Sequence, residues 1–223
     1  MIPLRDDQQN RAFPLVTFML IAVNVYVFIA WQLRVGVQES IDYRGFLPIE
    51  FTNHIPGGWP HLFMSMFMHG GWMHLIGNMC FLWAFGNSIE DNCGHIRYLI
   101  FYLLCGVVAT LAFTAVAPHS EVPLVGASGA ISGVLGAYLL HHPNARVLTV
   151  IPIWFFFRVV EIRAWFFLLI WIGFQVAAQL LTTPAHGAEG TGVAYVAHIG
   201  GFLTGMILIV FFEKGRDSRR TRA

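Results

Sequence analysis

A serine and a histidine inside apolar stretches are the residues through which this chain could carry out chemistry. Ser128 stands in a G-x-S-G motif that begins at Gly126, and His198 stands in an A-H-x-x-G motif that begins at Ala197. A neutral imidazole can take the proton of a serine hydroxyl and turn it into a nucleophile, and burial favours neutral histidine. Neither apolar stretch contains Asp or Glu, so the two residues would form a Ser–His dyad rather than a triad.

His74 and Asn78 are the polar residues that could support such a reaction. They lie four apart and therefore share one face of a helix. Together with the backbone N–H of Ser128, they could donate hydrogen bonds to the oxyanion of a tetrahedral intermediate. The alternative interpretation is a polar contact between packed helices. His69 lies about 140° around a helix from His74, and no Glu follows His74, so no metal site is predicted.

The position of Ser128 indicates a helix that begins inside the membrane. By itself, a G-x-S-G motif is also typical of tight helix packing. However, the 14 residues from Ser128 to His141 make only about 21 Å of helix, whereas the hydrocarbon core is about 30 Å thick. We therefore expect segment 118–127 to enter the membrane without helical structure, buried in protein or lining a wet cavity. Ser128 would then lie at a helix N-terminus, where the helix dipole favours negative charge.

Small residues around His198 predict that its helix approaches the helix of Ser128 closely. Ala194, His198, Gly201 and Gly205 fall on one stripe of a helix. The helix after Ser128 carries glycines of its own, and a flat glycine face lets two helices come close. His198 lies about 12 Å below the start of its apolar stretch, which matches the depth expected for Ser128. We therefore expect the imidazole and the hydroxyl to meet.

The composition requires these groups to be positioned by membrane helices. Charged residues make up 11% of the 223 residues and hydrophobic residues make up 57%, and the mean hydropathy is +0.64. So few charges could not solvate the surface of a soluble enzyme, and a net charge of +1 argues against a nucleic-acid binder. Three cysteines, an odd number, predict no disulfide framework. The sequence therefore predicts an integral membrane protein.

The distribution of charges predicts an all-α bundle of six transmembrane helices. Six charge-free stretches have at least 20 residues each: 12–33, 51–89, 98–120, 122–145, 164–188 and 190–212. The second stretch is too long for one helix, so its span is expected to start near residue 71, after a long outer loop of about 34–70. With six spans, 11 of the 13 basic residues lie on the side of both tails, which the positive-inside rule assigns to the cytoplasm. The expected organisation is a short N-terminal tail (1–11), a membrane domain (12–213) and a basic C-terminal tail (214–223).

Other polar side chains within the spans have structural interpretations. Asn24, Gln175 and Gln179 are expected to form hydrogen bonds between helices, because an amide in hydrocarbon needs a partner. Ser132 is expected to be a small packing residue. None of these four residues is therefore assigned to the chemistry.

Taken together, the motifs resemble those of the rhomboid intramembrane serine proteases of the six-span bacterial type. The matching residues follow the family order over about 69–205: His69, the H-x-x-x-N of His74 and Asn78, Glu90-Asp91 with Gly94, the G-x-S-G of Ser128, and the A-H-x-x-G-x-x-x-G that begins at Ala197. Each motif is modest alone, but the ordered set is specific.

The resemblance implies hydrolysis of a peptide bond in or near the single span of a membrane protein, without a cofactor. It implies Ser128 as nucleophile and His198 as base, with His74, Asn78 and the Ser128 backbone as the oxyanion hole. The expected partners are transmembrane substrates and the lipid bilayer, in a bacterial inner membrane with a site that opens to the outer side. The resemblance also suggests a lateral gate in the fifth helix and a cap formed by 183–193; the gate aromatics would be Trp165, Phe166, Phe167, Trp171 and Phe174. Such aromatic residues also commonly face lipid.

Two departures and two other functions bear on this interpretation. Many relatives carry Trp-Arg where this chain has Trp59-Pro60, so arginine anchoring of the outer loop is in doubt. Some relatives carry a Tyr where this chain has Ser132, so other packing would have to hold His198.

A rhomboid-like scaffold that binds membrane proteins without cutting them is the main alternative. An ion or metal transporter is less favoured, because the spans lack carboxylates and an inverted repeat.

Overall fold

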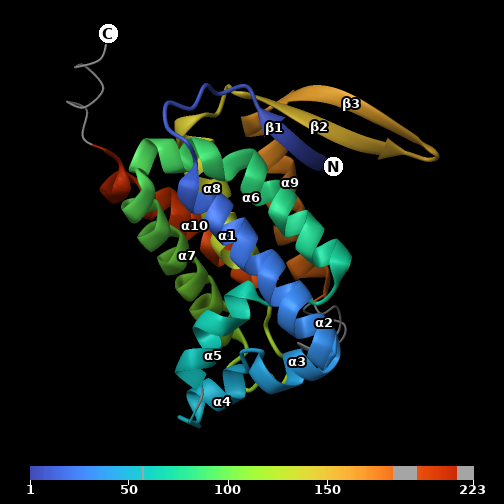
Figure 1. Ribbon diagram of the computed structural model, residues 1–223, viewed down its shortest axis with the longest axis vertical. Helices are drawn as coiled ribbons and strands as arrows, with labels where there is room; N and C mark the ends of the chain where they lie inside the picture. Colours follow the sequence, from blue (N-terminus) through green and yellow to red (C-terminus); the bar gives the residue numbers. More distant parts are fainter. Residues whose placement is uncertain (57, 183–194, 215–223) are drawn as a thin grey trace.

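Long helices lie side by side and form a bundle (Figure 1). The computed structural model describes residues 1–56, 58–182 and 195–214. The long helices are α1 (Leu15–Tyr26), α6 (Trp72–Cys93), α7 (His95–Val116), α8 (Ser128–His141), α9 (Ala164–Thr182) and α10 (Tyr195–Phe212). Helix α1 continues through a π-helical turn, η1 (Val27–Gln32), into α2 (Leu33–Val35). The expected, mostly helical architecture is confirmed.

Within the described residues, four helices are long and apolar enough to cross a membrane. They are Leu15–Val35, His95–Val116, Ala164–Leu181 and Tyr195–Phe212. The protein is therefore an integral membrane protein. Helix α8 has only 14 residues, about 21 Å, and α6 interrupts its apolar residues with polar ones such as Asn78 and Glu90. The count of six spans thus stays a prediction.

The segment between α2 and α6 is folded into short helices over one end of the bundle (Figure 1). These are α3 (Val37–Arg44), α4 (Pro48–Thr52), α5 (Gly58–Met64) and the 3-10 helix η2 (Ser65–Phe67). Phe46 pairs with Leu124 as an isolated β-bridge, and the Thr52 hydroxyl donates to the Pro118 carbonyl at 3.0 Å. The Trp59 ring meets Phe51 edge-on at 4.9 Å. Backbone pairing and aromatic packing therefore hold this loop.

A three-stranded antiparallel sheet, which the all-α expectation did not include, lies at the opposite end of the bundle. Its order is β1 (Ile2–Asp6), β2 (Arg146–Ile153) and β3 (Phe156–Arg163). The distribution of charges predicts only a connection at residues 146–163, although their Val, Ile, Thr and Phe residues favour strands. The 1–11 segment is correspondingly no free tail: the Asp6 carboxylate accepts hydrogen bonds from Tyr138 and Ser88, each at 2.6 Å.

Helix α8 forms the centre of the bundle, with α10 packed closely along it. Residues 130–138 of α8 are all buried. A Cβ atom at Gly205 would overlap the carbonyl oxygen of Gly133, and one at Gly201 would overlap that of Gly129. The glycine stripe therefore lets the two backbones touch, as the sequence predicts.

Glu90 ties the start of α1 to α6 and α7. Its buried carboxylate accepts the backbone N–H groups of Val16 and Thr17 at 2.8 and 2.7 Å and the Thr17 hydroxyl at 2.7 Å. His95 Nδ1 lies 2.5 Å from the same carboxylate. A negative charge that accepts the free N–H groups of a helix start stabilises that helix. Glu90 of the Glu90-Asp91 motif thus has a structural role.

Candidate active site

Ser128 is the first residue of α8 and follows an extended, non-helical segment. No helix covers 117–127 in the described chain, which confirms the predicted helix start. Gly126 donates its N–H to the Ser65 carbonyl at 2.9 Å. Glycine is required at this position, because its φ is +124° and a Cβ atom there would lie only 2.8 Å from the His74 ring. The first glycine of the motif therefore lets the serine segment pass directly beside His74.

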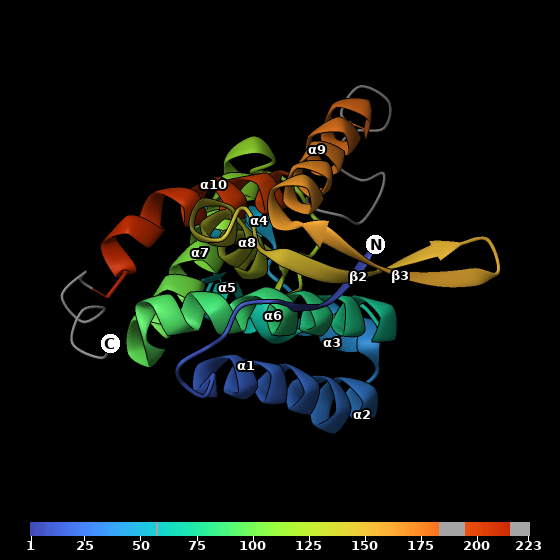
Figure 2. The same ribbon diagram turned by 90° about the horizontal axis from the view of Figure 1, so that it is seen from above.

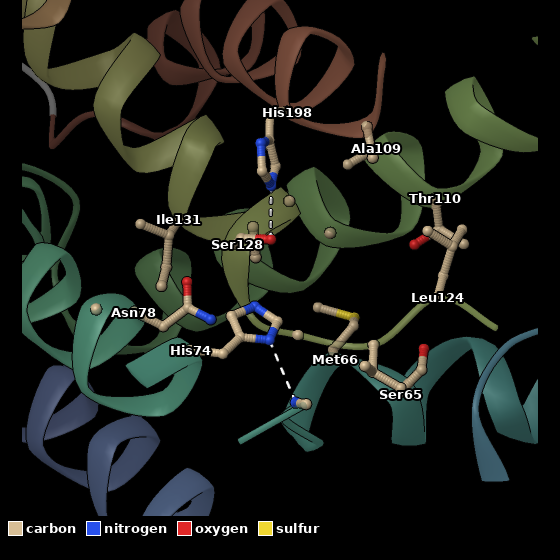
Figure 3. A pocket seen from close by; sticks show the side chains of 18 of the residues that line it. Ser65, Met66, His74, Asn78, Ala109, Thr110, Leu124, Ser128, Ile131 and His198 are labelled. Atoms are coloured by element: carbon tan, nitrogen blue, oxygen red, sulfur yellow. Dashed lines mark hydrogen bonds between the residues drawn. The ribbon is translucent and has the colours of Figure 1, made fainter. Parts of the chain in front are cut away.

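The hydroxyl of Ser128 and the imidazole of His198 meet across the α8–α10 contact (Figure 3). Ser128 Oγ lies 2.8 Å from His198 Nε2. This is hydrogen-bonding distance, as required for a base that removes the serine proton. The glycine contacts between α8 and α10 bring the two groups together from positions 70 residues apart in the chain.

Gln175, from α9, bonds the other nitrogen of the imidazole. Its Oε1 lies 2.8 Å from His198 Nδ1, and Gln175 is buried. An amide oxygen can only accept, so Nδ1 carries the proton and Nε2 remains free to accept from Ser128. The expected hydrogen bond from Gln175 to another helix is present. The sequence did not predict that its partner would be His198 of the dyad. By contrast, Asn24 Nδ2 bonds Leu20 of its own helix at 2.7 Å.

His74 and Asn78 place two donor groups beside Ser128 (Figure 3). The Gly70 N–H lies 3.3 Å from His74 Nδ1, which therefore accepts and leaves the proton on Nε2. Asn78 is 8% exposed, and its Nδ2 has no hydrogen-bond partner among the described residues. A buried amide donor without a partner is unusual and is suited to an incoming acceptor. Both side chains can thus donate into the space beside the serine.

His69 packs against His74, and its ring makes no hydrogen bond to Ser128 within the described residues. Its ring meets the His74 ring edge-on at 5.2 Å, and Gln32 holds its backbone through bonds of 2.9 and 3.1 Å. Burial, and to a smaller extent the neighbouring His74, lowers the pKa of His69 to about 3. The imidazole is therefore uncharged and acts as packing for His74.

Trp171 provides the packing of His198 that the Ser132 departure left in doubt. Its ring centroid lies 5.9 Å from that of His198, and it also stacks on Phe202 at 6.2 Å. Ser132 is buried and donates its hydroxyl to the Ser128 carbonyl at 2.6 Å, as expected of a small packing residue. An aromatic residue from α9 therefore packs beside the histidine.

A cavity of about 760 Å³ contains these groups. It extends from the short helices over the bundle end down to the dyad, and its lining includes Ser128, His198, His74, Asn78 and Gln175. A space of this size, lined by apolar side chains with a few polar groups among them, can admit a segment of peptide chain. The arrangement can therefore carry out nucleophilic attack by serine with acid–base assistance and an oxyanion site.

Helix α9 presents two different faces. Phe167 is buried and Trp171 contacts His198, whereas Trp165, Phe166 and Phe174 are 43 to 63% exposed. Among the aromatic residues named for a gate, Trp171 therefore faces the site, Phe167 packs in the core, and the other three face outward. Whether α9 moves as a gate stays a prediction, and the proposed cap at 183–193 lies outside the described residues.

Comparisons with known proteins agree with this geometry. Residues 56–214 match the family model of the Rhomboid domain. The chain is 30% identical to the rhomboid protease GluP of Bacillus subtilis over 78% of its own length and 32% of that protein. It is 26% identical to the chloroplastic rhomboid-like protein 11 of Arabidopsis thaliana, over 94% of the chain and 70% of that protein. It is 28% identical to the mitochondrial rhomboid protein 1 of Saccharomyces cerevisiae, over 93% and 56%.

Proposed function

The chain belongs to the rhomboid family, and from this membership we propose that it is an intramembrane serine endopeptidase. Its substrates would be membrane proteins that cross the bilayer once, cut in or near the transmembrane segment. The chain spans about a third of GluP and just over half of the yeast relative, so the reaction is argued from the site of this chain. The observation that carries the proposal is the 2.8 Å contact between Ser128 Oγ and His198 Nε2, beside a buried Asn78 amide that has no hydrogen-bond partner in the described part of the chain.

In the proposed reaction, His198 carries one proton while Ser128 is acylated and one proton while the acyl-enzyme is hydrolysed. His198 Nε2 takes the hydroxyl proton while Ser128 Oγ attacks the scissile carbonyl carbon. The protonated imidazole then gives this proton to the leaving amine, and an acyl-enzyme remains. Water, activated by the same imidazole, attacks the ester, and the serine recovers its proton as the carboxylic acid product leaves. The two steps return Ser128 and His198 to their starting states, and neither step requires a cofactor.

The proposed oxyanion hole consists of three donors around Ser128. They are the His74 Nε2–H, the Asn78 amide and the backbone N–H of Ser128, which as the first residue of α8 lacks an intrahelical acceptor. Donors that are fixed before the reaction stabilise the negative oxygen of the tetrahedral intermediate without reorganisation. The start of α8 adds the positive end of its helix dipole.

In the proposed setting, the protein spans a bilayer. Both described chain ends lie on the side that carries most of the basic residues, which corresponds to the cytoplasm. The cavity then opens toward the short helices 37–67 on the other side, where water can enter. Relatives of the chain include proteins named as mitochondrial and chloroplastic, so the comparisons do not favour a bacterial inner membrane. The proposal therefore states which side of the membrane the chain ends and the cavity face, and it does not specify the kind of membrane. It includes no nucleic-acid partner.

Loss of the Ser128 hydroxyl tests the proposal directly. Purified full-length protein is expected to cleave a single-span reporter and to react with a fluorophosphonate probe. Ser128→Ala should abolish both, a loss of at least about 10³-fold, because the acyl-enzyme of the proposed reaction forms on the Ser128 oxygen. Product bands and probe fluorescence on gels give the measurement.

The matched control is Thr204→Ala, which removes a hydroxyl that donates to the Gly200 carbonyl of its own helix at 2.7 Å. This variant should cleave like the wild type. Cleavage that survives Ser128→Ala would exclude Ser128 as nucleophile. A wild type that binds the reporter but neither cleaves it nor takes up the probe would instead support the scaffold alternative.

A further inference from the structure

The hairpin of β2 and β3 ends in a cluster of exposed aromatic side chains, which we call the aromatic tip. It comprises Trp154, Phe155, Phe156 and Phe157, whose exposed fractions are 92, 89, 78 and 76%. The hairpin runs sideways past the helices, so its tip lies beyond the bundle (Figures 1 and 2). Four consecutive exposed aromatic side chains are unfavourable in water and indicate a partner surface.

The base of the hairpin sets the height of the tip relative to the bilayer. Strand β3 ends at Arg163, and the membrane-spanning helix α9 begins at the next residue, Ala164. Ala164 donates its N–H to the Ala145 carbonyl at 2.9 Å, and Trp165 donates to the Pro143 carbonyl at 2.9 Å. The hairpin is thus joined to a span without a linker and leaves the bundle at the level where that span ends.

One face of the hairpin points along the bundle toward the membrane. Near the base, Val147 is buried in the core and pairs with Ile162, which packs against the same core. Side chains alternate along a strand, so Arg158 and Phe156 further out lie on this same face. The outer part of this face extends beyond the edge of the bundle. There it would lie over the lipid that surrounds a membrane protein.

The chemistry of the tip matches the interface of a bilayer with anionic lipids. Trp side chains are favoured at the level of the headgroups, and Phe is common on the apolar face of segments that lie in the interface. Between Val147 and Val160 the only charged residue is Arg158, which is exposed on the membrane-facing side. An arginine can extend its charged end to lipid phosphate while its stem stays among apolar groups.

We propose that the aromatic tip inserts into the headgroup region of the adjacent leaflet and that Arg158 binds the phosphates of anionic lipids there. The hairpin would then anchor the start of α9, the helix that carries Trp171 and Gln175 to the candidate site. This inference needs only the membrane location of the protein and does not depend on proteolysis.

Lipid quenching of a fluorophore at the tip tests the insertion. Full-length protein with Cys80→Ser and Phe156→Cys is labelled with bimane in vesicles of three parts phosphatidylcholine and one part phosphatidylglycerol. The control is Glu161→Cys, in the same strand but on the opposite face, where the side chain is 57% exposed. Lipids brominated near the headgroup end should quench the label at 156 at least about twofold more than at 161. Aqueous iodide should show the reverse order.

Equal quenching of both positions by iodide would overturn the proposal, because the tip would lie in water. Protection of position 156 from iodide and from brominated lipid alike would also overturn it, since a protein would then cover the tip. Arg158→Gln tests the lipid charge separately: phosphatidylglycerol should increase lipid quenching at 156 in the parent but not in this variant. A thermal melt confirms that each exposed substitution leaves the fold intact.

Discussion

Gln175 determines which nitrogen of His198 faces the serine. Its amide oxygen accepts the Nδ1 proton at 2.8 Å, and Nε2 is then held toward Ser128. Without a fixed partner, the imidazole could take the other tautomer or rotate away from the hydroxyl. Gln175 would therefore be a positioning residue, with a role like that of the third group of a catalytic triad but without its charge.

Replacement of Gln175 is expected to slow catalysis without preventing folding. Gln175→Leu keeps the size of the side chain but leaves the Nδ1–H of His198 without an acceptor. We expect cleavage to fall about tenfold or more, since the lost bond and the unpaired donor together cost about 1.4 kcal/mol or more. The loss should lie in kcat rather than KM, because substrate contacts are unchanged. Steady-state cleavage of the reporter measures both.

Gln175→Glu is the conservative companion of that variant, because it retains an acceptor oxygen at the same distance from the backbone. It should recover most of the activity and of the fluorophosphonate labelling rate. If Leu and Glu variants cleave equally well, Gln175 has no positioning role. Loss in both variants, with a lowered melting temperature, would show that the amide acts only in packing.

At the scale of elements, the contact between α8 and α10 determines whether a site exists. The carbonyl oxygens of Gly129 and Gly133 would overlap Cβ atoms placed at Gly201 and Gly205. Even one methyl group must push the helices apart, and His198 is carried by the helix that would move. The sequence predicts this contact from the spacing of small residues, since a helix places every third and fourth residue on one face.

Gly205→Ala is therefore expected to damage both stability and activity. Overpacking of a tight core contact costs about 1–3 kcal/mol, and separation of the helices lengthens the bond between Ser128 and His198. We expect a lower melting temperature in detergent and a large loss of reporter cleavage. Gly173→Ala in α9 is the matched control, because a Cβ atom there meets nothing within 4 Å. Similar behaviour of the two variants would show that the α8–α10 contact tolerates a methyl group.

At the scale of the whole molecule, the structure places both described chain ends at one end of the bundle. Strand β1 pairs with β2 there, and the Lys214 ammonium donates to the Asp91 carbonyl at 2.9 Å between α6 and α7. Ends on one side require an even number of membrane crossings. The short helices 37–67 lie at the other end (Figure 1), which agrees with the predicted outer loop.

This sidedness can be measured with one cysteine introduced at either end of the bundle, in protein that also carries Cys80→Ser. In intact cells, a membrane-impermeant maleimide should label Glu39→Cys in α3 and should label Glu161→Cys in β3 only after the membrane is opened. The reason is that 11 of 13 basic residues are expected on the side of the sheet. The opposite labelling order would invert the topology, and labelling of both positions in intact cells would contradict the bundle as a membrane-spanning unit.

The sequence by itself determined the class of the protein, the position of most spans and the candidate residues of the dyad and oxyanion hole. These follow from local rules: scarce charge requires lipid, helix periodicity groups residues on faces, and a polar residue in an apolar stretch is costly enough to be noticed. The recessed start of α8 also followed, because helix length is proportional to residue number.

Only the tertiary structure decided which side chains surround His198 and what residues 1–11 and 146–163 form. Gln175 and Trp171 lie 23 and 27 residues from His198, in another helix, and the partner of a lone amide depends on helix rotation and tilt rather than on spacing. The sheet joins residues such as Ile2 and Val150, a pairing that chain entropy opposes until the bundle brings both segments together. Local patterns identify groups that need partners, and the packing of distant elements supplies those partners.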